Sequence, residues 1–168
     1  MQGRNVRVDF STTEVDRMKP LLKRAGKREI GGVLMAEQIT EGHFRVVDFS
    51  VDETTGSAAH FVRSPEHHRL ALSAFFDRTG SDFTRFNYLG EWHSHPSYPV
   101  VPSHQDIASM QELVEGERGI HFAILMIVKR ARFWRFECSA LLFQKGLSPQ
   151  GVDLSICELR GHESTRAR

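Results

Sequence analysis

The stretch EWHSHPSYPVVPSHQD, residues 91–106, carries the most informative pattern of the sequence. His93 and His95 are two residues apart on a predicted strand, so their side chains point to one face. Asp106 follows a proline-rich loop and falls in the first turn of a helix that is predicted to begin at Ser103. Two imidazoles and one carboxylate form a three-ligand set, which on zinc leaves the fourth tetrahedral position to water. Such an open position is typical of a catalytic zinc site.

The same residues also allow a purely structural interpretation. A single H-x-H pair is a weak signal for a metal site. Ser103 and Asp106 fit a capping box, in which each side chain bonds the other residue's backbone N–H at the start of a helix. Spacing alone therefore leaves metal binding and helix capping equally open. Seven further histidines lack comparable spacing and are interpreted as structural or solvated: His43, His60, His67, His68, His104, His121 and His162.

Strands and helices are predicted to alternate along the rest of the chain. The first helix begins at a capping box in residues 11–14, and Pro20 is expected to kink it or to divide it. The second has Ser64 as its N-cap and Pro65 as its first residue. No element is predicted after Gly146. Apolar or alternating runs indicate strands at residues 6–10, 30–35, 43–51, 86–95 and 120–128, with one or two more within 133–143.

This order predicts a single α/β (α+β) domain over residues 1–160, with a frayed polar tail at 161–168. The chain has 168 residues, of which 40% are hydrophobic, and its net charge is +1. These values argue against a disordered chain and against a protein that coats nucleic acid or an anionic membrane. The basic and aromatic segment 129–137 is interpreted as a hairpin, with side chains that alternate between faces along residues 133–136.

The sequence also predicts where the protein works. The N-terminal residues contain no apolar segment of a secretory signal, and no apolar run approaches the roughly 18 residues that span a membrane. Cys138 and Cys157 are interpreted as reduced thiols, because neither belongs to a disulfide framework or a C-x-x-C pair. The cytoplasm is therefore the expected location.

Two motifs together resemble those of the JAMM (MPN+, or JAB) metallopeptidases. The pattern H-x-H-P, five residues, P-S, two residues, D matches HSHPSYPVVPSHQD at every fixed position. The family's earlier pattern, E-x-x-G-x-L-x-G, matches EIGGVLMA, Glu29–Ala36, except that Ala36 replaces the final glycine. The resemblance covers most of the chain. It implies a cytidine-deaminase-like JAB/MPN domain, in which a curved mixed sheet is flanked by about three helices.

The resemblance also implies a role for each matched side chain. His93, His95 and Asp106 resemble the ligands of one zinc ion, which lowers the pKa of a bound water towards about 7. Glu29 resembles the general base that takes the proton of this water and passes it to the departing amine. Ser103 resembles the hydroxyl donor that stabilises the oxyanion of the tetrahedral intermediate.

Glu91 is a competing candidate for the general base. At a spacing of two residues, Glu91, His93 and His95 share a strand face, so strand geometry alone favours Glu91. The resemblance favours Glu29. In that case Glu91 is expected to line the pocket or to support the metal ligands.

The sequence is most similar to the prokaryotic branch of the family, which includes the deconjugating peptidases of bacterial CBASS anti-phage operons. This resemblance implies hydrolysis of the amide bond after the C-terminal residue of a ubiquitin-like modifier or modifier-like tail, which reverses or primes conjugation. The implied partners are an E1–E2-like conjugating enzyme and a cGAS-like nucleotidyltransferase, without nucleic acid or a membrane. Two alternatives stay open: a processing peptidase for a ThiS- or MoaD-type sulfur-carrier precursor, and a non-catalytic MPN-like scaffold.

Overall fold

The computed structural model describes residues 6–53 and 65–158 of the chain. The strands in these ranges are β1 (Arg7–Ser11), β2 (Gly31–Thr40), β3 (His43–Phe49), β4 (Phe86–Ser94), β5 (Phe122–Arg130), β6 (Phe136–Gln144), β7 (Gln150–Gly151) and β8 (Asp153–Cys157). The helices there are α1 (Thr12–Ala25), α2 (Pro65–Arg78) and α3 (His104–Gly116), with a short 3-10 turn at Arg132–Trp134. The expected N-cap Ser64, the histidines His60 and His162, and the tail at 161–168 lie outside the described residues.

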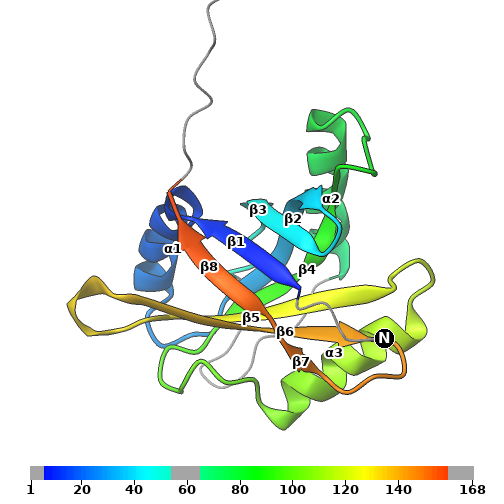
Figure 1. Ribbon diagram of the computed structural model, residues 1–168. Coiled ribbons are helices and arrows are strands. Elements are labelled where there is room, and N and C mark those ends of the chain that lie inside the picture. The colour runs from blue at the N-terminus through cyan, green and yellow to red at the C-terminus, as the bar shows by residue number, and fades with distance from the viewer. Residues whose placement is uncertain (1–5, 54–64, 159–168) are drawn as a thin grey trace, which may run out of the picture.

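The strands form one mixed sheet in the order β7-β6-β5-β4-β2-β3-β1-β8. β4 pairs in parallel with β5, and β1 pairs in parallel with β3 and β8. The sheet is so curved that its two edges approach each other (Figure 1), and only Val152 separates β7 from β8 along the chain. The backbone N–H of Val152 donates to Ala140 on β6, and that of Asp153 donates to Val6 beside β1. A curved mixed sheet with three helices confirms the predicted fold class.

The expectation that no element follows Gly146 is wrong, because β7 and β8 occupy this region. β7 has only two residues, and β8 is half-buried or exposed along its whole length. β7 is too short to give a pattern, but the alternation of Val152, Leu154 and Ile156 with Asp153 and Ser155 is a strand signal that the prediction overlooked. Hydrogen bonding to β6 and to β1, which is distant in sequence, holds them in place.

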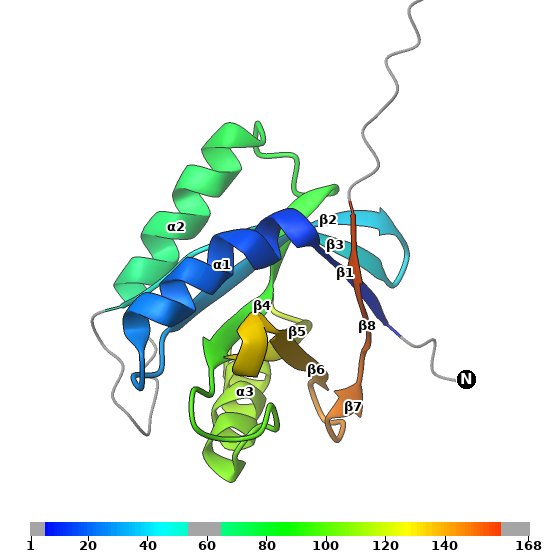
Figure 2. The ribbon, with the colours of Figure 1, turned by 90° about the vertical axis from the view of Figure 1, so that its left-hand side faces the viewer.

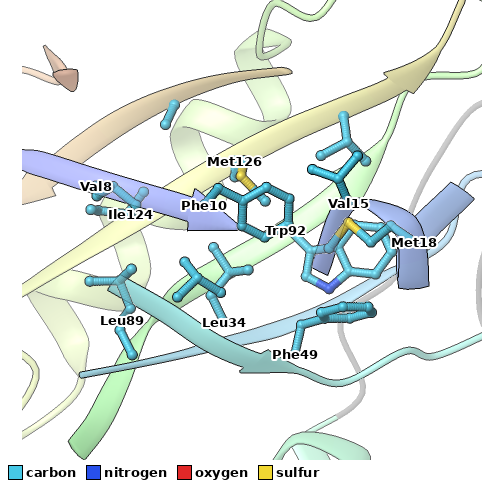
Figure 3. Packing of buried hydrophobic residues seen from close by; sticks show 14 of the residues in the cluster. Val8, Phe10, Val15, Met18, Leu34, Phe49, Leu89, Trp92, Ile124 and Met126 are labelled. Carbon is cyan, nitrogen blue, oxygen red and sulfur yellow. The ribbon is translucent and has the colours of Figure 1, made fainter. Parts of the chain in front are cut away.

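The helices lie on both faces of the sheet (Figure 2). α1 buries its apolar side chains against one face, where Val15 and Met18 pack near Phe10 and Trp92 (Figure 3). On the other face, α2 contributes Phe75 to one apolar cluster. The buried apolar side chains of α3 belong to a second cluster on that face. Among the described residues, no helix is both long and apolar enough to cross a membrane.

Pro20 does not divide the first helix, which begins after the predicted N-cap Ser11 and continues as one element to Ala25. A proline inside a helix removes the hydrogen bond to the carbonyl four residues earlier, here that of Asp16. Both residues are exposed, so water can satisfy this carbonyl. Of the two expected effects of Pro20, a kink or a boundary, the boundary is therefore absent from α1.

β4 contains a bulge that decides which side chains reach which face. Leu34 of β2 pairs with Gly90, but Met35 pairs with Tyr88, so Leu89 is an extra residue on β4. The bulge shifts the alternation by one residue. Leu89 and Trp92 consequently both pack in the cluster that contains α1. The functional end of β4 thus presents its odd-numbered residues to the face covered by α2 and α3.

Gly90 is expected to tolerate no side chain at this bulge. A Cβ on Gly90 would lie 1.9 Å from the backbone oxygen of Ile124 on β5. We predict that Gly90→Ala lowers the free energy of unfolding in urea by about 1–3 kcal/mol or more, as for an overpacked core. Gly151→Ala, whose Cβ would meet nothing within 4 Å, is the control and should be close to neutral. Equal stability of the two variants would contradict this account of the bulge.

The basic and aromatic segment after β5 is a hairpin, as expected, because β5 and β6 pair antiparallel. Its tip is not a strand, however. Residues 132–134 form a 3-10 turn, and Phe133 has a φ of 56° and is 85% exposed. The predicted alternation of residues 133–136 is therefore wrong, since the chain must reverse direction within this segment.

Candidate metal centre

The end of β4 and the first turn of α3 bring the three predicted ligands together. Nε2 of His93 lies 3.2 Å from Nε2 of His95 and 3.3 Å from Oδ1 of Asp106. Nε2 of His95 lies 3.7 Å from the other carboxylate oxygen, Oδ2 of Asp106, and one ligand atom from each residue can be chosen so that all three lie within 4.8 Å of one another. Tetrahedral zinc with bonds of about 2.0–2.1 Å places its ligand atoms about 3.3–3.4 Å apart. The donor types and their spacing therefore fit one zinc ion.

The capping box and the candidate ligand set use the same side chains together. Oγ of Ser103 accepts from the backbone N–H of Asp106 at 3.1 Å, and Oδ2 of Asp106 accepts from the N–H of Ser103 at 2.6 Å. The predicted cap is thus confirmed. It fixes the carboxylate at the start of α3, from where Oδ1 faces His93. The two interpretations that spacing left open are therefore compatible.

The ring of His95 is oriented by the loop that follows it. Nδ1 of His95 lies 2.9 Å from the carbonyl oxygen of Pro99, which can only accept. This hydrogen bond assigns the proton to Nδ1 and leaves the lone pair of Nε2 directed at the other two ligands. A histidine in this tautomer is ready to bind a metal ion.

The charge state of Asp106 also suits metal binding. Burial alone would raise the pKa of Asp106, but the neighbouring His93 and His95 hold it well below its usual range. Asp106 is therefore a carboxylate at neutral pH, the form that binds metal. The Asp106 carboxylate raises the pKa of His95, while burial of the ring acts in the opposite direction.

Glu29 lies beside the histidines although it is 64 residues before His93 in the chain. The next residue, Ile30, exchanges hydrogen bonds with Ser94: its N–H donates to Oγ of Ser94 at 3.0 Å, and its carbonyl accepts from the N–H of Ser94 at 2.8 Å. Ser94 stands between the two histidines. Glu29 is only 5% exposed, and its charge is among the causes that raise the pKa of His95.

Gly31 allows this close approach of β2 to β4. Gly31 pairs with His93, and a Cβ on Gly31 would lie 2.3 Å from the carbonyl oxygen of Trp92 and 2.8 Å from Cβ of His93. Any larger residue would push the start of β2, and with it Glu29, away from the ligands. Gly31, at the second variable position of the E-x-x-G pattern, therefore serves the geometry of the site.

Glu91 reaches a different neighbour. It is 6% exposed, and its Oε1 lies 3.9 Å from Nδ1 of His68 on α2. Both side chains are among the residues that line a cavity of about 730 Å³ beside α2. Sequence reasoning treated His68 as background. The one sequence feature that could have indicated a buried His68 is its position one helical turn before Leu72, on the side of α2 that packs on the sheet.

The other predicted orientations on β4 are confirmed. Trp92 is fully buried in the cluster that contains α1, and its Nε1 donates to the carbonyl of Ser50 at 2.9 Å. Ser94 points to the same side and bonds Ile30. His93 and Glu91 therefore lie on the opposite face, towards α3 and α2.

Comparison with known proteins identifies the family. Residues 13–137 match the family model described as prokaryotic homologs of the JAB domain. The match covers well over half of the chain, so the protein belongs to the prokaryotic JAB family, in agreement with the resemblance of its motifs.

Two individual proteins are similar to this chain. The CD-NTase/cGAS isopeptidase of Vibrio cholerae serotype O1 is 30% identical over 109 residues, which are 63% of this chain and 65% of that relative. The match thus spans just under two thirds of the relative's length. The solution structure of protein DSY2949 from Desulfitobacterium hafniense has a TM-score of 0.68 and 19% identity, over 93% of this chain and 97% of that one. This second likeness supports the fold alone.

Proposed function

We propose that the protein is a zinc-dependent isopeptidase that hydrolyses the amide bond after the C-terminal residue of a ubiquitin-like modifier or modifier-like tail. The observation that carries the proposal is the cluster of His93, His95 and Asp106, whose donor atoms match the spacing of a tetrahedral zinc site. Membership in the JAB family supports it, and so does similarity to a relative named as an isopeptidase.

Each side chain of the site has a chemical role in this proposal. Bound zinc would supply Lewis acidity and lower the pKa of a water molecule towards about 7. His93, His95 and Asp106 hold the ion from two rigid elements. The Glu29 carboxylate accepts a proton from the attacking water and delivers it to the departing nitrogen. The Ser103 hydroxyl, at the start of α3, donates a hydrogen bond to the oxygen on which negative charge develops.

The name of the Vibrio relative supports a narrower substrate. That protein is named a CD-NTase/cGAS isopeptidase, so the proposed target here is a conjugate of a cGAS-like nucleotidyltransferase. The proposal also includes an E1–E2-like enzyme as the source of this conjugate. In this proposal the protein works in the cytoplasm, where it removes or primes the conjugate during anti-phage defence.

The proposal is tested with a fusion of the C-terminus of a cGAS-like nucleotidyltransferase to a reporter protein. We expect mass spectrometry to show cleavage immediately after the natural C-terminus, loss of cleavage with a chelator, and recovery with zinc. A sulfur-carrier precursor extended beyond its terminal Gly-Gly serves as the second substrate. Cleavage of this precursor alone would contradict the nucleotidyltransferase assignment, and cleavage of neither substrate would contradict a peptidase.

Ser103 has both a structural and a chemical role, and one substitution separates them. Glycine at an N-cap costs only a few tenths of a kcal/mol relative to serine, but it has no hydroxyl. We predict that Ser103→Gly folds and binds zinc like the wild type, while kcat falls by about 10²–10³-fold through loss of the oxyanion donor. Steady-state kinetics at a measured zinc content provide the test, and an unchanged kcat would remove Ser103 from the mechanism.

A further inference from the structure

Three consecutive carbonyls of the loop between β4 and α3, those of residues 98–100, each accept a hydrogen bond from a side chain. Nζ of Lys129 donates to the first at 3.0 Å. Nδ1 of His95 donates to the second, that of Pro99, at 2.9 Å. Oγ of Ser139 donates to the third. The acceptor that orients His95 therefore has an anchored carbonyl on each side of it.

The two outer donors are placed by the register of the sheet. His93 on β4 pairs with Ile127 on β5, and Ile127 pairs with Ser139 on β6. Paired residues point to the same face, and so does Lys129, two residues after Ile127. The face of β4 that carries the histidines thus continues across β5 to both donors. The loop lies over this continuous face.

We infer that Lys129 and Ser139 are positioning residues for the candidate metal centre, an inference that rests on the proposed zinc site. By holding the carbonyls of residues 98 and 100, they fix the carbonyl of Pro99, which in turn holds the ring of His95 with Nε2 directed at Asp106. Neither side chain belongs to the ligand set or to the motif that predicted it.

The loop has a second geometric effect. It connects His95 on the strand side to Ser103 and Asp106 on the helix side. Anchoring its middle to β5 and β6 therefore also fixes the distance between the ligands contributed by the two elements. Residues that orient metal ligands in this way typically change metal affinity by about 10–100-fold when they are removed.

The first test measures zinc affinity of the full chain by competition with a chromophoric chelator. Ser139→Ala and Lys129→Met are each expected to weaken binding by about 10-fold, and the double variant by about 100-fold. Ser139→Thr keeps the hydroxyl and should bind within about twofold of the wild type. Matched controls are Ser73→Ala and Lys145→Met, which remove a hydroxyl and a charge from exposed positions away from the loop. Single variants that bind zinc as tightly as the controls would overturn the inference.

The second test needs no metal and separates this inference from the proposed function. Long-range ¹H–¹⁵N spectra of the metal-free protein at alkaline pH, where the ring is neutral, report which nitrogen of His95 carries the proton. We expect the Nδ1–H tautomer in the wild type and a mixture of tautomers in the double variant. A wild type that binds no zinc would contradict the proposed function. The inference about Lys129 and Ser139 would then be decided only by whether the tautomer of His95 differs between the wild type and the double variant. An unshifted tautomer in a folded double variant would contradict it.

Discussion

A Glu29→Gln variant is expected to keep its zinc and to lose about 10²–10⁴-fold in the rate of amide hydrolysis, the usual contribution of a general base. Glutamine has nearly the same size as glutamate, so the packing around this buried position is preserved. The amide cannot accept the proton of the attacking water. Steady-state rates on the tail fusion, normalised to zinc content, measure the effect.

The matched control is Glu91→Gln, which alters the other buried carboxylate near the ligands. Because Glu91 faces His68 in the cavity beside α2, we expect this variant to keep most of its kcat and to change mainly KM. An active, zinc-replete Glu29→Gln protein together with an inactive Glu91→Gln protein would reverse the assignment. Strand geometry alone favours that reversed assignment, so the pair of variants is decisive.

An Asp106→Asn variant is expected to lose stoichiometric zinc and, with it, hydrolysis, by at least as large a factor as Glu29→Gln. The amide oxygen of asparagine can still accept from the N–H of Ser103, so the cap of α3 is retained. The same amide carries no charge and is a much poorer ligand for zinc than a carboxylate. Metal content after dialysis and the hydrolysis rate provide the two readouts.

Thermal unfolding of the metal-free proteins is the control for this variant. Without zinc, Asp106→Asn should unfold somewhat below the wild type, because the variant loses the interaction of the carboxylate with His93 and His95. Only the wild type should gain stability when zinc is added. Full zinc binding by the variant would exclude Asp106 as a ligand.

Sequence reasoning could predict the candidate metal centre, because the sequence signals for this centre come from residues that are close together in the chain. The spacing of His93 and His95 on one strand and the capping box at Ser103 are properties of neighbouring residues, and both are present in the structure. The resemblance of the segment around Glu29 to the family motif predicted that Glu29 lies near the two histidines. Residue spacing could not predict this, since β2 and β4 come together only by pairing in the sheet.

The rest depends on contacts between segments that are distant in sequence. The bulge at Leu89 shifts the alternation of β4, and Gly90 beside it is a residue type that suggests a bulge or a close approach within a strand, but it does not show which residue is the extra one. β7 and β8 are held by strands at opposite edges of the sheet. The approach of Glu91 to His68 requires α2 to lie on the sheet, and the anchoring of the loop requires the register from β4 to β6. A pattern read along the chain does not show which of these segments contact each other.

The measurement that tests the central claim most directly is a zinc titration of the metal-free wild type with hydrolysis of the tail fusion as the readout. The account predicts that activity rises linearly with added zinc and reaches its plateau at one equivalent per chain, because the three ligands form a single site. Hydrolysis that persists in the metal-free protein, or a protein that binds no stoichiometric zinc and stays inactive, would contradict a zinc-dependent isopeptidase.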